Sequence, residues 1–254
     1  MIRRLFNLAL VILLAPAVYA FTYEGVLYLA SVFTLDSTKW FLVGAVLSLV
    51  VYVFLLYGNI AFIEHLLHEL EHAFVSFLFT FQLPRRMEVD PTLGSAVFVA
   101  DRGCLTALAP YYFPLLTVPF LIFKAVAFWL LKGSLPTFAA VTFDLLIGAT
   151  LMFHYVTTLG EFRLIQTDIR RSGIIPSLVL VLFLNFMFLV LTVTVVTGSY
   201  TEFVEYVKVA LETTVDSYQA AFEFLKTQLL PAARDLIQCL IDLFCEMFAS
   251  APAP

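Results

Sequence analysis

The stretch from Trp40 to Phe81 reads WFLVGAVLSLVVYVFLLYGNIAFIEHLLHELEHAFVSFLFTF. It is apolar for about twice the length of one membrane-crossing helix, which needs about 20 residues. Gly58 and Asn59 interrupt it, and both residue types favour turns. The stretch therefore predicts a membrane span over 40–57 and a second helix over 60–81.

The composition sets the class of protein. Of 254 residues, 62% are hydrophobic and only 13% are charged, and the mean hydropathy is +0.98. The hydrophobic content and the mean hydropathy lie above those of soluble globular domains, and the charged content lies below, so we expect an integral membrane protein in contact with the lipid bilayer. The predicted fold class is mainly α, with about five to six membrane-spanning or membrane-embedded helices. The net charge of −5 and the lack of a basic run exclude nucleic acid as a partner.

Other stretches extend this plan on both sides. A first membrane helix is expected from about Leu5 to Tyr23, followed by a short polar connection around 36–39, so that residues 1–39 form the first unit. The core, 40–198, then holds the helix over 60–81, a β-hairpin over 87–100 and three apolar segments, 104–131, 136–157 and 174–198. The hairpin is predicted because β-branched residues alternate around the turn signal D-P-T-L-G. Asp144 and Asn185 fall inside apolar segments, where we expect each to hydrogen-bond to a neighbouring helix.

The tail, residues 199–254, has a different composition. It carries eight acidic and three basic residues, and its apolar residues recur at helical spacing. We expect two or three amphipathic helices, interrupted near Pro231. Their apolar faces need a partner, which is either the helices themselves, the membrane surface, another subunit or another protein.

Basic residues orient the predicted spans. Eight of them precede or join the spans on one side, against two on the other. The eight are Arg3, Arg4, Arg85, Arg86, Arg102, Arg163, Arg170 and Arg171, and the two are Lys39 and Lys132. By the positive-inside rule, the N-terminus, the hairpin and the loop over 161–172 are cytoplasmic and the tail is outside. The membrane expected for such a chain is the plasma (inner) membrane.

The helix over 60–81 contains the motif H-E-x-x-H as His68, Glu69 and His72. At about 100° per residue, these side chains and His65 share one helix face. Two imidazoles one turn apart can reach one Zn²⁺ ion, and the glutamate between them can contact a water at that ion. The pattern predicts a zinc site, with His65 and Glu71 as auxiliary candidates; an incidental polar face at the membrane surface is the alternative. His65 is a fourth ligand, a hydrogen-bond donor to the transition state or simply a polar neighbour. Glu71 lies at the edge of the same face.

Three features together resemble the site-2 protease family of intramembrane zinc metalloproteases, over residues 40–198. They are H-E-L-E-H on a membrane-associated helix, a stretch of β character soon after it, and D-I-R-R-S-G at the start of a later membrane helix. The resemblance implies that His68, His72 and Asp168 bind zinc and that Glu69 is the general base. It also implies that the hairpin, with Val89, Val97 and Val99, presents the substrate in an extended form.

The chain departs from that family at two places, as a divergent member would. Glu71 stands before the second histidine, where the family usually has a small residue. The downstream motif reads Q-T-D-I-R-R-S-G rather than the usual leucine-aspartate-glycine or asparagine-proline-aspartate-glycine. His154 and Glu161 are therefore alternatives to Asp168 as the third zinc ligand.

Two functions are expected from these patterns. The first is a zinc metallopeptidase that hydrolyses peptide bonds of membrane proteins or membrane-associated peptides with a zinc-activated water and Glu69 as the base. The second is a non-catalytic membrane subunit, in which the H-E-x-x-H site is structural or vestigial and the external tail binds a partner protein.

Overall fold

The computed structural model describes residues 2–81, 103–162 and 166–249. Helices make up 89% of these described residues, and no strand occurs among them, which confirms the mainly α class. The predicted hairpin over 87–100, with Val89, Val97 and Val99, lies outside the described residues.

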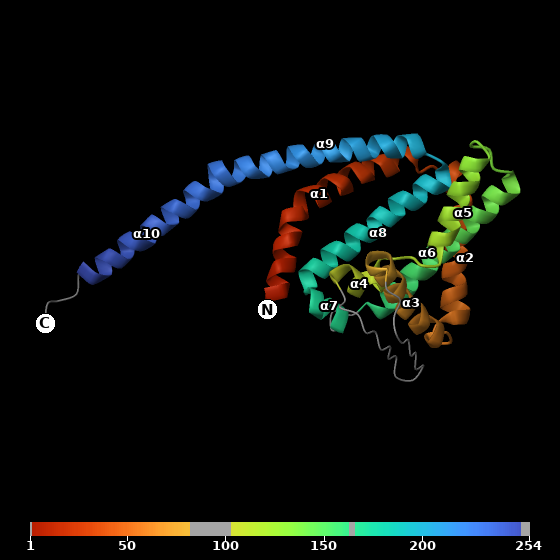
Figure 1. The fold of residues 1–254 in the computed structure, drawn as a ribbon, viewed down its shortest axis with the longest axis horizontal. Helices are drawn as coiled ribbons and strands as arrows, with labels where there is room; N and C mark the ends of the chain where they lie inside the picture. The colour runs from red at the N-terminus through yellow and green to blue at the C-terminus, as the bar shows by residue number, and fades with distance from the viewer. Residues whose placement is uncertain (1, 82–102, 163–165, 250–254) are drawn as a thin grey trace.

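Two long helices open the chain (Figure 1). Helix α1 (Ile2–Val32) is longer than the predicted first span and contains Pro16, and α2 (Leu35–Val51) continues into a π-helical turn, η1 (Tyr52–Leu56). The predicted polar connection around 36–39 is wrong, because these residues form the first turn of α2. Thr34 caps that turn by accepting a hydrogen bond from the backbone N–H of Ser37 (3.3 Å), and Asp36 complements the helix dipole there.

The break predicted at Gly58 is confirmed. Gly58 has φ +76°, a conformation that glycine adopts without strain, and α3 (Ala61–Thr80) begins three residues later. Helix α3 carries the H-E-x-x-H motif and ends at Thr80; the capping residue Phe81 has a left-handed conformation (φ 54°).

The segment expected over 104–131 is divided into three short helices. These are α4 (Cys104–Leu108), the 3₁₀ turn η2 (Ala109–Tyr111) and α5 (Thr117–Leu130). Pro110 lies in η2 and Pro114 follows it, and proline cannot supply the N–H that a continuous α-helix needs. The two remaining helices of the core are long: α6 (Thr137–Glu161) and, after the short α7 (Thr167–Ser172), α8 (Ile174–Thr197).

The described residues contain four helices that are long and apolar enough to cross a membrane. They are Ala9–Val32 in α1, Leu35–Leu56 in α2 and η1, Thr137–Glu161 in α6 and Ile174–Thr197 in α8. Helix α5 is apolar but shorter. These helices agree with a membrane protein.

Close packing of α2 against α6 fixes one side of the core. A Cβ atom on Gly148 would lie 2.0 Å from the carbonyl oxygen of Phe41, and one on Gly44 would lie 2.1 Å from that of Leu145. Only glycine allows two helix backbones to approach so closely, as is common between membrane helices.

Buried polar bonds also join the core helices, as predicted for Asp144 and Asn185. The ammonium group of Lys124 on α5 donates to Asp144 on α6 and to the carbonyl oxygen of Val196 on α8 (2.7 Å). Asn185 on α8 donates to the carbonyl oxygen of Tyr111 (2.7 Å). This last bond joins α8 to η2, which packs against α3.

The tail forms α9 (Tyr200–Phe224), the π-helical turn η3 (Leu225–Leu229) and α10 (Leu230–Ala249). Helix α9 packs along α1, where Tyr206 donates to the carbonyl oxygen of Phe21 (3.0 Å) and Tyr218 to that of Leu13 (2.8 Å). Helix α10 then extends away from the other helices (Figure 1). The interruption predicted near Pro231 is the turn η3, which ends two residues before that proline. The ring of Pro231 would clash with the carbonyl group of Thr227 in a regular α-helix, and Thr227 lies within η3.

Candidate metal centre

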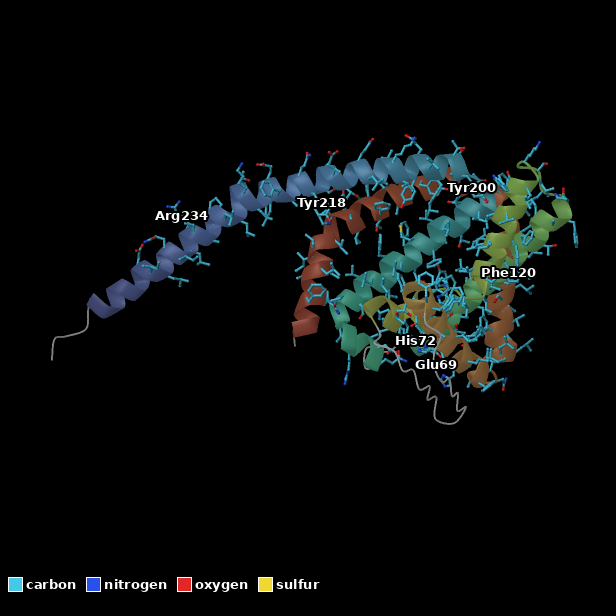
Figure 2. All side chains as sticks on the ribbon, in the orientation of Figure 1. Glu69, His72, Phe120, Tyr200, Tyr218 and Arg234 are labelled. Atoms are coloured by element: carbon cyan, nitrogen blue, oxygen red, sulfur yellow. The ribbon has the colours of Figure 1, made fainter. Side chains whose placement is uncertain are left out.

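The H-E-x-x-H motif folds as its spacing predicts. His68, Glu69 and His72 each offer a ligand atom, and these atoms lie within 4.8 Å of one another. Among the residues that the structure describes, this is the one group of three that could hold a metal ion. Figure 2 shows Glu69 and His72 at the end of the bundle opposite to α9.

His72 is held in a defined tautomer. It is 1% exposed, and its Nδ1 lies 2.8 Å from the backbone carbonyl oxygen of Thr106 on α4. A carbonyl oxygen only accepts hydrogen bonds, so Nδ1 carries the proton and Nε2 keeps its lone pair. Nε2 is therefore the atom with which His72 can bind a metal.

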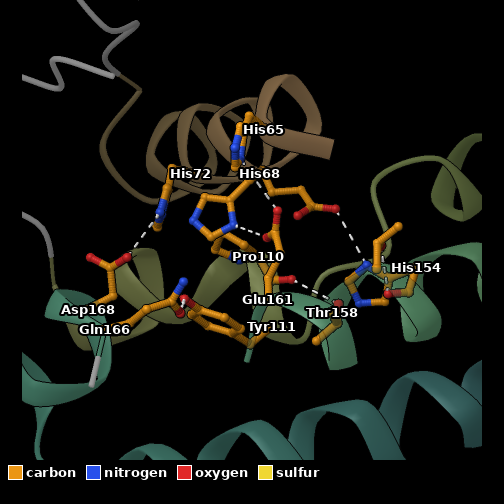
Figure 3. Close-up of polar contacts among 12 residues, drawn as sticks. His65, His68, His72, Pro110, Tyr111, His154, Thr158, Glu161, Gln166 and Asp168 are labelled. Carbon is orange, nitrogen blue, oxygen red and sulfur yellow. Dashed lines mark hydrogen bonds and ion pairs between the residues drawn. The ribbon is translucent and has the colours of Figure 1, made fainter. Parts of the chain in front are cut away.

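Asp168 approaches that nitrogen from α7 (Figure 3). Its Oδ2 lies 3.6 Å from His72 Nε2, and the neighbouring Ile169 is fully buried, which anchors α7. With metal–ligand bonds of about 2.0–2.2 Å in tetrahedral geometry, two donor atoms on one zinc ion lie roughly 3.3 Å apart. The pair is thus close to the separation that a shared ion requires.

His68 faces a different carboxylate. Its Nδ1 lies 2.7 Å from Oε2 of Glu161, the last residue of α6, and Oε1 of Glu161 lies 3.7 Å from Nδ1 of His65. Burial lowers the pKa of His68, but the hydrogen bond and the charge of Glu161 outweigh burial and leave that pKa above its ordinary value.

The carboxylate of Glu69 is partly unsatisfied. Its Oε2 is buried and has no hydrogen-bond partner among the described residues. A buried carboxylate oxygen in this state is unfavourable, and a water beside the metal ligands would satisfy it. The residues present therefore fit a zinc ion with a water next to Glu69.

Glu71 and His154 form a separate buried pair between α3 and α6. They are 7% and 6% exposed, and 3.5 Å separates Glu71 Oε1 from His154 Nδ1. Burial raises the pKa of Glu71 to about 9. His154, one of the alternative ligands, thus faces Glu71 rather than the three-residue motif group.

A small cavity lies beside this pair. Its volume is about 20 Å³, which is room for a water molecule. Polar residues from two helices line it, namely Glu64, His68 and Glu71 of α3 and Thr150, His154, Thr157, Thr158 and Glu161 of α6. The Nε2 atom of His154 is buried there without a hydrogen-bond partner among the described residues.

Three residues of the centre were missed by sequence reasoning. Thr106 contributes a backbone carbonyl, so its side chain gives no signal in the sequence. Tyr111 packs edge-on against His68 (ring centroids 5.7 Å apart) and donates a hydrogen bond to Gln166. Gln166 precedes Asp168 by two residues, and its position beside D-I-R-R-S-G was the one available clue.

The centre thus combines two histidines, one aspartate and one buried glutamate, drawn from α3 and α7 and supported by α4 and α6. In catalytic zinc sites, three protein ligands leave a fourth position for water or substrate. Comparisons with protein-family models, curated proteins and solved structures gave no match.

Proposed function

We propose that this chain is an intramembrane zinc metalloprotease of the site-2 protease kind. The observation that carries the proposal is the grouping of His68, Glu69 and His72 within 4.8 Å, together with the 3.6 Å between His72 Nε2 and Asp168 Oδ2. The first three share one face of α3, whereas Asp168 comes from α7, far along the chain. An incidental polar helix face does not explain why a carboxylate of another helix lies 3.6 Å from Nε2 of its most buried histidine, whereas a metal site does.

His68, His72 and Asp168 would hold the metal. Zinc bound there supplies Lewis acidity, which lowers the pKa of a bound water towards neutrality and polarises the scissile carbonyl. Glu69 takes the proton of the attacking water through its buried oxygen and delivers it to the leaving amine.

The substrate class follows from the surroundings of the centre. Four candidate spans place it in a membrane protein, so its substrates are peptide segments of membrane proteins or membrane-associated peptides. A helical substrate must unwind first, because its backbone groups are bonded internally in lipid. The segment 87–100, whose sequence predicts a β-hairpin, would then pair with the extended substrate.

We place the centre on the cytoplasmic side of the plasma (inner) membrane. The support is twofold: the count of basic residues, and the arrangement in Figure 1, in which α3, α7 and the N-terminus lie at one end of the bundle and α9 at the other.

The test uses full-length protein purified in detergent. We expect one zinc per chain, loss of zinc in His72→Ala, and loss of cleavage of a reconstituted membrane substrate in Glu69→Gln with zinc retained. Unchanged cleavage by Glu69→Gln would exclude the proteolytic function.

A second candidate function rests on the tail. The end of α9, the turn η3 and helix α10 expose large apolar residues, namely Phe222, Leu225, Leu229, Leu230, Leu236, Ile237, Leu240 and Ile241. Such a surface suits a non-catalytic subunit that docks a partner protein or associates with itself. Zinc content identifies a vestigial site, which would not hold a full equivalent of metal, and cleavage that is lost in Glu69→Gln separates a catalytic zinc site from a structural one.

A further inference from the structure

We propose that Glu161 is a positioning residue of the metal centre, which orients the ligand His68, and that it is not itself a ligand. This role rests on the proposed function, because it assumes that His68 binds zinc. It assigns to the end of α6 a task in the centre that the motif alone does not reveal.

The geometry of His68 carries the first step. Its Nδ1 and Glu161 Oε2 are 2.7 Å apart, a hydrogen bond that a carboxylate can only accept. Nδ1 must therefore be the protonated nitrogen. The metal-binding lone pair is left on Nε2, on the other side of the ring.

The second histidine of the motif follows the same rule. Nδ1 of His72 is bonded to a carbonyl oxygen of Thr106 at 2.8 Å, so both histidines present Nε2 to the centre (Figure 3). The two acceptors differ, because Glu161 is charged and Thr106 is not. A carboxylate makes a stronger bond and raises the basicity of the imidazole it holds, so His68 becomes the stronger donor to the metal.

The position of Glu161 in its helix supports a role beyond stability. It is the last residue of α6, where the helix dipole disfavours a negative charge. One turn earlier, Thr158 donates to the carbonyl oxygen of Pro110 (3.2 Å), which fixes the end of α6 against η2. The helix end is thus held where the carboxylate meets His68.

Both oxygens of Glu161 are directed at histidine Nδ1 atoms. Oε2 accepts from His68, and Oε1 faces His65 at 3.7 Å. Asp168, in contrast, faces the Nε2 side of His72. Glu161 therefore contacts the nitrogen of His68 that does not bind the proposed metal, whereas Asp168 faces the metal-binding nitrogen of His72.

The experiment measures zinc affinity of the full-length chain by competition with a chelator. Glu161→Leu removes the acceptor, and Glu161→Gln keeps an acceptor without the charge. The matched control is Glu64→Leu, because Glu64 lines the same cavity on α3 but is bonded to Tyr52 (2.9 Å). We expect affinity to fall about 10- to 100-fold in Glu161→Leu, much less in Glu161→Gln, and not in Glu64→Leu.

A second readout needs no metal. The chain has four histidines, so the Nδ1–H signals of metal-free, ¹⁵N-histidine-labelled protein can be assigned by substitution. We expect a strongly hydrogen-bonded signal from His68 that disappears in Glu161→Leu. Persistence of that signal would overturn the pairing even if zinc binds.

Three zinc results would also overturn the role. They are unchanged affinity in Glu161→Leu, an equal loss in Glu64→Leu, and a loss in Glu161→Gln as complete as that in His72→Ala, which would make Glu161 a ligand. If the wild-type chain takes up no zinc, the proposed function itself is contradicted. If the wild-type chain binds zinc and a variant gives any of these three results, only the role of Glu161 is contradicted.

Discussion

Asp168 and His72 face each other across the candidate centre, with 3.6 Å between Asp168 Oδ2 and His72 Nε2, although they belong to helices far apart in the chain. This separation distinguishes Asp168 from the other two proposed third ligands. His154 faces Glu71, and Glu161 binds the Nδ1 side of His68.

The third ligand can be identified by substitution. Asp168→Ala should weaken zinc binding by more than the about 10- to 100-fold expected for loss of an outer partner, because it removes a direct bond to the metal. His154→Ala should leave zinc content unchanged. Metal analysis of the purified, folded chains decides between them; loss of zinc in His154→Ala with retention in Asp168→Ala would reverse the assignment.

Glu69 is expected to act in catalysis and not in metal binding. Glu69→Gln keeps the size of the side chain but removes the base, so cleavage should fall about 10²- to 10⁴-fold while zinc stays bound. The measurement pairs zinc content with turnover of a membrane substrate. Loss of zinc in this variant would show that Glu69 is a ligand, since its carboxylate lies within reach of both histidines.

The sequence predicted the parts of the centre that depend on local spacing. His68 and His72 share a face because a helix repeats every 3.6 residues, and Gly58 marks the start of that helix through its own backbone preference. Asp168 was predicted as a ligand only from the resemblance to a family motif, since no local pattern connects α7 to α3.

The remaining contacts depend on tertiary packing and could not be predicted. The hydrogen bond that His68 donates to Glu161 depends on the packing of α6 on α2, which brings the end of α6 to α3. The acceptor for His72 is a main-chain carbonyl. In the tail, the interruption predicted near Pro231 is present, but its form, a π-helical turn over Leu225–Leu229, could not be predicted from composition.

Glu71 fills a site where the resembling family usually has a small residue, and its packing can be tested. Glu71→Gly should destabilise the chain by about 2–5 kcal/mol, because it leaves a cavity between α3 and α6 and removes the neighbour of His154 Nδ1. The control is Glu212→Gly, an exposed position in the middle of α9, where only helix propensity of about 1 kcal/mol is lost. Thermal unfolding in detergent provides the comparison, and equal losses in the two variants would show that Glu71 does not contribute to packing.

The packing of α2 against α6 should affect the stability of the chain and its zinc binding, although the contact lies outside the centre. In Gly148→Ala, the new methyl group would lie 2.0 Å from the backbone oxygen of Phe41, so the two helices must separate. We expect overpacking to destabilise the chain by about 1–3 kcal/mol and to weaken zinc binding, since α6 carries Glu161. Gly160→Ala, on the same helix, is the matched control, because its nearest neighbour would be the hydroxyl of Tyr52 at 4.0 Å. It should be neutral or slightly stabilising, as alanine is the better helix former. If Gly148→Ala unfolds at the same temperature as the wild type and keeps its zinc, the position of α6 does not depend on this crossing.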